Sequence, residues 1–146
     1  MATVELRFSA LPEHVRTARL VAAAVARRAG VDEAVLDEVR LAVGEACSRA
    51  VGLHQVSGIT APVKVSLIEE EKLFSIEVGD EARHAPTGVR TSGAAADDPD
   101  AEAEEDEMGL AVISGLVDDV EVTAGEHGGL IRMTWPTTPP PTGVLP

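Results

Sequence analysis

The chain begins with hydrophobic and polar residues in strict alternation. Across 2–9 the apolar side chains fall at every second position, which is the period of a half-buried strand. The alternation returns across 63–67 and 73–78, and the charged stretch EEEK between them predicts a hairpin turn. Two further strands are expected over 119–124 and 130–135, joined by the turn GEHGG. The pattern therefore predicts a first strand followed later by two hairpins.

Two long stretches with helical spacing lie between the first strand and the first hairpin. Pro12 opens the earlier one at a position where proline is tolerated, and Gly30 is a typical helix stop. Asp32 is a suitable N-cap for the second helix, which is expected to run to about residue 53. Gly44 inside this helix costs about 1 kcal/mol relative to alanine, so we expect another group to pack closely against it.

The order of elements predicts an α+β fold. We expect a two-layer α/β sandwich, with one mixed, mainly antiparallel sheet and helices on one face, including a short buried helix over 108–117. One domain of about 1–136 fits the length. It would contain a flexible, lid-like loop at about 85–107, and the proline-rich tail 137–146 is expected to be disordered.

Charge and composition narrow the classes of function. The formal net charge is −13, and eight of the acidic residues lie within 97–107. Such a chain is repelled by nucleic acid and by anionic membranes, so we expect no direct contact with either. No apolar run is long enough to cross a membrane, and no signal peptide is expected. Cys47 is the only cysteine, which suits a cytoplasmic protein and a small buried hydrophobe.

Several ordered segments resemble one known family. They are FSALPEHVRTARL (8–20), LAVGEACSRAV (41–51), IEVGDEARH (76–84), EMGLAVISGLVDDVEV (107–122) and GGLIRMTW (128–135). Together they resemble the anti-sigma factor serine kinases, which share an ATPase fold with histidine kinases, gyrase and a heat-shock chaperone. The resemblance covers about residues 4–136. It implies a histidine-kinase-like ATPase fold, a homodimer, and a site for ATP and Mg²⁺.

The resemblance also assigns roles to residues of that site. Glu45 takes the place of the glutamate that accepts a proton from the attacking serine or orients the attacking group. Asp80 takes the place of the aspartate that accepts a hydrogen bond from adenine. Gly109 would let backbone amides approach phosphate. The family's Mg²⁺-binding asparagine is replaced by Arg49, whose guanidinium has no acceptor and is no metal ligand.

The sequence also departs from the family pattern at positions that would contact other parts of ATP. The glycines of the adenine-side loop are replaced by Ala82 and His84, and Gly129 stands in place of a threonine. Loss across several parts of one site argues that kinase activity is weak or absent. Arg49 would then either contact phosphate in place of the metal, or pair with Glu45 and fill an empty pocket. An ordinary ion pair one helical turn apart is the simpler reading of Glu45 and Arg49.

Partner contacts follow from the resemblance as well. Arg19 aligns with a family arginine that touches both a sigma factor and a STAS-type anti-anti-sigma protein, and Arg16 on the same face would widen that patch. Both are otherwise solvent-facing helix charges. His84 and His127 lack a second ligand at suitable spacing, so we expect no metal site there.

Three functions remain open at this point. The first is an anti-sigma factor that sequesters an RNA polymerase sigma factor and exchanges it for an anti-anti-sigma protein. The second is an active serine/threonine kinase with an altered metal site. The third is a nucleotide-free dimeric scaffold.

Overall fold

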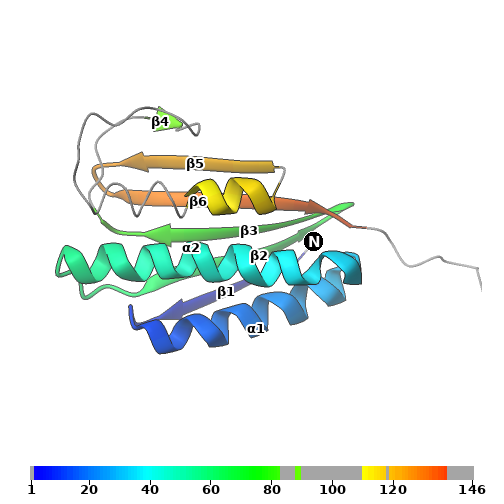
Figure 1. The fold of residues 1–146 in the computed structure, drawn as a ribbon, viewed down its shortest axis with the longest axis horizontal. Helices are drawn as coiled ribbons and strands as arrows, with labels where there is room; N and C mark the ends of the chain where they lie inside the picture. Colours follow the sequence, from blue (N-terminus) through cyan, green and yellow to red (C-terminus); the bar gives the residue numbers. More distant parts are fainter. Residues whose placement is uncertain (1, 83–87, 90–109, 118, 138–146) are drawn as a thin grey trace, which may run out of the picture.

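The computed structural model describes residues 2–82, 88–89, 110–117 and 119–137 (Figure 1). Its elements are β1 (Ala2–Phe8), α1 (Pro12–Ala29), the 3-10 turn η1 (Glu33–Val35), α2 (Leu36–Val56), β2 (Val63–Glu70), β3 (Leu73–Asp80), β4 (Gly88–Val89), a helical segment at 110–116, β5 (Asp119–Gly125) and β6 (Gly128–Pro136). All predicted strands and helices are present, and within the described residues β4 is an addition to them.

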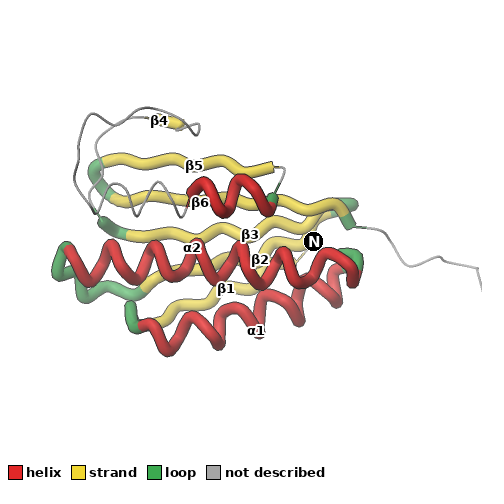
Figure 2. Tube along the Cα trace, in the orientation of Figure 1, coloured by secondary structure: helices red, strands yellow, loops and turns green. Residues whose placement is uncertain are grey.

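The strands form one sheet in the order β1-β2-β3-β6-β5-β4. Every neighbouring pair is antiparallel. The hairpins β2–β3 and β5–β6 therefore meet at the centre, where β3 pairs with β6. Both long helices and the helical segment at 110–116 lie over one face (Figures 1 and 2). The predicted α+β sandwich with helices on one face is confirmed, but the sheet, which was expected to be mixed, is wholly antiparallel among the described residues.

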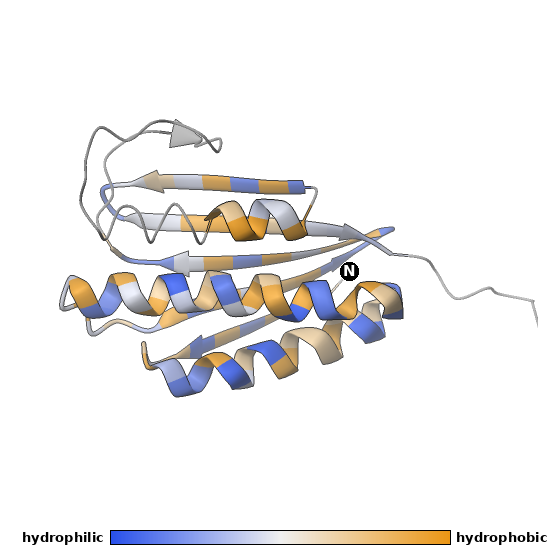
Figure 3. Ribbon diagram, viewed as in Figure 1, coloured by the Kyte–Doolittle hydropathy of each residue, from blue (hydrophilic) through white to orange (hydrophobic). Residues whose placement is uncertain are grey.

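The core lies between this sheet face and the helices. Alternate residues of the central strands point into it, such as Phe74, Ile76 and Val78 of β3, which are almost fully buried. Small buried residues on the helices, such as Ala18, Ala22 and Ala46, allow close packing. Figure 3 shows that hydrophobic and hydrophilic residues alternate in bands along α1 and α2. Ile113 and Val117 join the same core, so the helical segment at 110–116 buries one face only.

Helix ends agree in part with the prediction. Gly30 ends α1 in a left-handed conformation (φ 104°), and its N–H bonds back to α1 carbonyl groups, as expected for a glycine stop. Asp32 does act as a cap, but it accepts from Ala34 N–H of η1. The α-helix proper begins only at Leu36 and runs to Val56, because one 3-10 turn separates it from its cap.

Parts of the expected organisation lie outside the described residues. These are most of the loop at 85–107, the start of the third helix with Gly109, and the tail 138–146. Within the described part of the chain, no helix is long and apolar enough to cross a membrane.

Candidate functional site

Asp80 occupies the end of the buried row of β3. Because side chains alternate along a strand, residue 80 faces the helices, as residues 74, 76 and 78 do. Its side chain is only 2% exposed. A carboxylate in this position must be satisfied by partners inside the protein, since desolvation of an unpaired charge is costly.

Arg49 of α2 is one of these partners. Its Nη1 lies 3.8 Å from Asp80 Oδ2, and the Arg49 side chain is 7% exposed. The ion pair thus joins α2 to the end of β3 in a nearly dry environment. Arg49 reaches toward the end of the sheet, where the attraction to a buried carboxylate is less screened, and its expected pairing with Glu45 stays a prediction.

A turn after β3 satisfies the other oxygen of Asp80. Asp80 Oδ1 accepts a hydrogen bond from Ala82 N–H at 2.9 Å, which is an Asx turn. Ala82 itself is 1% exposed. The adenine-side loop therefore keeps its aspartate and builds a side-chain-capped turn in place of the first glycine.

Gly128 brings the start of β6 against the same turn. It has a φ of 140°, and a Cβ at this position would overlap the carbonyl oxygen of Asp80. Only glycine meets both demands without strain. Gly128 is thus required as a glycine by the backbone geometry itself, independently of any ligand.

His54 was not predicted as part of this region. It is fully buried near the end of α2, where its Nε2 accepts from Glu81 N–H at 2.9 Å. Its Nδ1 must then carry the proton, and it donates to Ala61 C=O at 3.0 Å. His54 thereby ties α2 to the loop before β2 and to the turn after Asp80. Its spacing from Cys47, Ala50 and Val51 on the buried face was the available signal.

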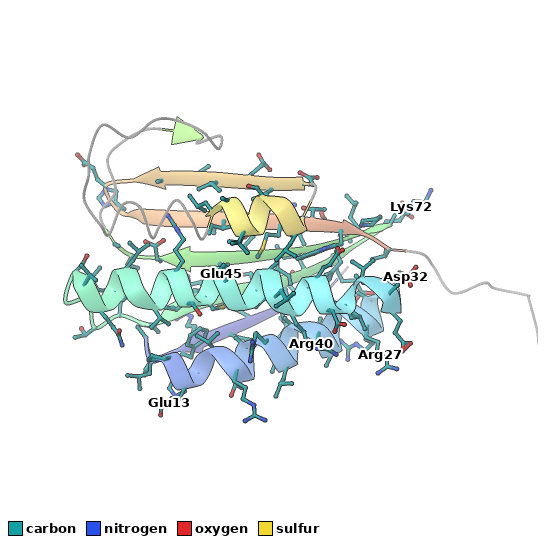
Figure 4. The ribbon with its side chains drawn as sticks, in the orientation of Figure 1. Glu13, Arg27, Asp32, Arg40, Glu45 and Lys72 are labelled. Carbon is teal, nitrogen blue, oxygen red and sulfur yellow. The ribbon has the colours of Figure 1, made fainter. Side chains whose placement is uncertain are left out.

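Glu45 lies midway along α2, one turn before Arg49 (Figure 4). It is half-buried, so its carboxylate retains access to solvent. Arg16 and Arg19 lie on α1 and not beside Asp80; Arg16 is exposed and Arg19 is half-buried. The structure therefore brings together Arg49 and Asp80 but keeps the expected partner-contact residues on a separate helix. Gly109 lies outside the described residues.

Cys47 is buried and unreactive in this region. Burial raises the pKa of the Cys47 thiol to about 12, so it stays protonated at neutral pH and is a poor nucleophile. In the described part of the chain, no cluster of three or more His, Cys, Asp or Glu side chains is arranged to hold a metal ion.

The donor set fits Mg²⁺ and ATP poorly. Mg²⁺ needs oxygen ligands, and residue 49 supplies a cation. An adenine amino group would have to compete with the Arg49 guanidinium and Ala82 N–H for Asp80. The arrangement instead resembles the filled interior of a protein, in which a buried charge pair links two elements.

Comparisons with known proteins agree on the fold. A family model described as histidine kinase-like ATPase domain matches residues 8–135. The chain is similar to the serine-protein kinase RsbW of Bacillus pumilus, with 29% identity over 140 residues, covering 90% of this chain and 83% of the relative. The corresponding protein of Oceanobacillus iheyensis is 25% identical over 134 residues, covering 90% and 84% of the two chains.

A solved structure of the RsbU and RsbW domains of Rv1364c from Mycobacterium tuberculosis superposes with a TM-score of 0.65 at 16% identity. The alignment covers 92% of this chain and 31% of that longer one. At this identity the likeness describes the fold.

Proposed function

Because the chain belongs to the histidine kinase-like ATPase domain family, we propose that it acts as an anti-sigma factor whose kinase activity is weak or lost. It would bind and sequester an RNA polymerase sigma factor in the cytoplasm as a homodimer. A STAS-type anti-anti-sigma protein would compete for it. The similarity to the serine-protein kinases RsbW supports this class of function.

One observation carries the loss of kinase activity: the buried ion pair between Arg49 and Asp80. Phosphoryl transfer depends on metal ions that neutralise charge developing on the phosphates. Arg49 replaces the residue expected to hold that metal and engages the residue expected to read adenine. The arginine at position 49 therefore opposes binding of both the metal ion and the adenine of Mg²⁺–ATP.

Retention of Glu45 favours the second candidate, an active kinase. Its half-buried carboxylate stays at the position of the family's proton acceptor. This candidate requires that Mg²⁺ and ATP bind and displace Arg49 from Asp80. The third candidate is a nucleotide-free dimeric scaffold that only exchanges protein partners.

Calorimetric titration with ATP and Mg²⁺ separates these candidates. We expect no measurable heat of binding for the wild-type chain and restored binding for Arg49→Asn. Arg40→Asn is the matched control, since Arg40 is an exposed residue of the same helix and should leave the titration unchanged. Magnesium-dependent ATP binding by the wild type, followed by serine phosphorylation of an anti-anti-sigma protein with labelled ATP, would establish the active kinase.

Partner binding is tested separately from nucleotide binding. The sigma factors and STAS-type proteins of the source organism are purified, and each is titrated against the chain. We expect one sigma factor to bind and one STAS-type protein to displace it without added ATP. Binding of STAS-type proteins alone would favour the scaffold.

A further inference from the structure

The close contact expected at Gly44 is made by a side chain from the other long helix. A Cβ at Gly44 would lie 2.6 Å from Arg19 Cδ and 3.4 Å from its Cγ. The hydrocarbon stem of Arg19 therefore passes from α1 across bare backbone of α2. We call this contact of the Arg19 stem with Gly44 the seat. Glycine in a helix interior costs about 1 kcal/mol relative to alanine, so the seat is gained at the expense of the helix propensity of α2.

The guanidinium group of Arg19 is held differently from those of several other arginines in the described part of the chain. Arg7, Arg27 and Arg40 each lie within ion-pair distance of a nearby carboxylate. Among the described residues, no hydrogen bond or ion pair engages the Arg19 guanidinium, although acidic residues outnumber basic ones 25 to 12 in the sequence. Its stem is fixed while its donors remain available. Arg16, one turn earlier on α1, is exposed and likewise has no ion pair within the described part.

We propose that Gly44 is a positioning residue, which seats Arg19 across α2 as a preorganised anchor for a carboxylate of the protein partner. This inference rests on the proposed function, because it requires a partner that docks on α1. Guanidinium groups bind carboxylates through a planar fork of donors. Fixing the stem before binding removes part of the entropy lost when a long side chain is immobilised.

The seat also lies next to the candidate site in the chain. Gly44 directly precedes Glu45 on α2. A partner that moves the Arg19 side chain would therefore change a packing contact of α2, the helix that carries Glu45 and Arg49.

Gly44→Ala tests the seat, and Gly52→Ala is its matched control. Gly52 lies in the same helix, and a Cβ there would meet nothing within 4 Å. The Arg19 stem is flexible, so we expect Gly44→Ala to fold and to displace Arg19. ¹⁵N relaxation of the Arg19 Nε–Hε group should show an ordered side chain in the wild type and Gly52→Ala, and a mobile one in Gly44→Ala. An equally ordered Arg19 in all three proteins would overturn the seat.

Partner affinity tests what the seat is for, with the sigma factor or STAS-type protein that binds the wild-type chain. We expect Gly44→Ala to weaken binding about threefold to tenfold, and Gly52→Ala to leave it unchanged. In an Arg19→Ala background, Gly44→Ala should have no further effect. A loss that persists in that background would overturn the positioning role.

The outcomes separate failure of the seat from failure of the proposed function. If Arg19→Ala weakens binding and Gly44→Ala does not, the seat is refuted and the anti-sigma proposal stands. If no candidate partner binds the wild type, the proposed function fails, and an ordered Arg19 is then intramolecular packing alone.

Discussion

The two faces of the sheet hold arginine–carboxylate pairs in opposite environments. On the face covered by helices, Arg49 and Asp80 approach to 3.8 Å with side chains 7% and 2% exposed. On the open face, Arg132 and Glu77 approach to 3.2 Å with side chains 36% and 23% exposed. The open pair is the closer one, yet we expect the buried pair to matter more to stability.

Solvent explains this difference. Charges on the open face are screened by water and salt, and exposed pairs are worth about 0–1 kcal/mol. Inside the protein, removal of one partner leaves the other charge desolvated, which costs about 3–5 kcal/mol. Burial, and not the separation of the atoms, sets the energetic role of each pair.

Asp80→Asn should give the largest effect. It keeps an acceptor for Ala82 N–H but removes the buried negative charge that lies 3.8 Å from the Arg49 guanidinium. We expect the free energy of unfolding in urea to fall by about 3–5 kcal/mol. The double variant Arg49→Met with Asp80→Asn removes both charges and should recover much of this loss. A double variant as unstable as Asp80→Asn would show that packing, and not charge, dominates.

Cys47 extends the comparison to the pH dependence of the covered side. Its pKa is raised by burial from 9.0 to about 12, so the unfolded chain loses this proton first as the pH rises. Between these values the folded state binds more protons, and stability therefore falls with rising pH, by roughly 1.4 kcal/mol per pH unit. Urea unfolding from pH 8 to about pH 11 should show this slope. Cys47→Ala should lack it, and an identical slope in both proteins would contradict the assignment.

Glu77→Gln should give the smallest effect, because Arg132 keeps a second carboxylate, that of Glu70, at 3.7 Å. We expect a loss of at most about 1 kcal/mol at low salt, and less at 1 M salt. Thermal unfolding at the two salt concentrations measures it. A loss as large as that of Asp80→Asn would mean that the open face is covered in solution.

Much of the fold could be predicted because its signals are local. Alternation located the strands, Gly30 ended α1, and the GEHGG turn joined β5 to β6. The end of α2 was placed too early, and its start too soon after Asp32, because the η1 turn depends on tertiary packing. The resemblance to the family was found from several sequence segments that occur in the expected order, since their spacing reflects the whole domain.

The candidate site could be predicted only in part. Residue types and positions identified Glu45, Arg49 and Asp80, but spacing along α2 favoured a pair between the first two. His54 was overlooked because its role is defined by two backbone groups outside α2: Ala61 C=O in the loop after the helix, and Glu81 N–H in the turn after β3. Contacts of this kind exist only once α2 lies on the sheet.

The sequence by itself determined the elements, their order, the lone buried cysteine and the replacement of a metal ligand by Arg49. These follow from local periodicity and from the chemistry of single side chains. Only the tertiary structure decided which carboxylate Arg49 faces and why Gly44 is a glycine. Both answers depend on groups brought together from separate elements: Asp80 from the end of β3, and the stem of Arg19 from α1.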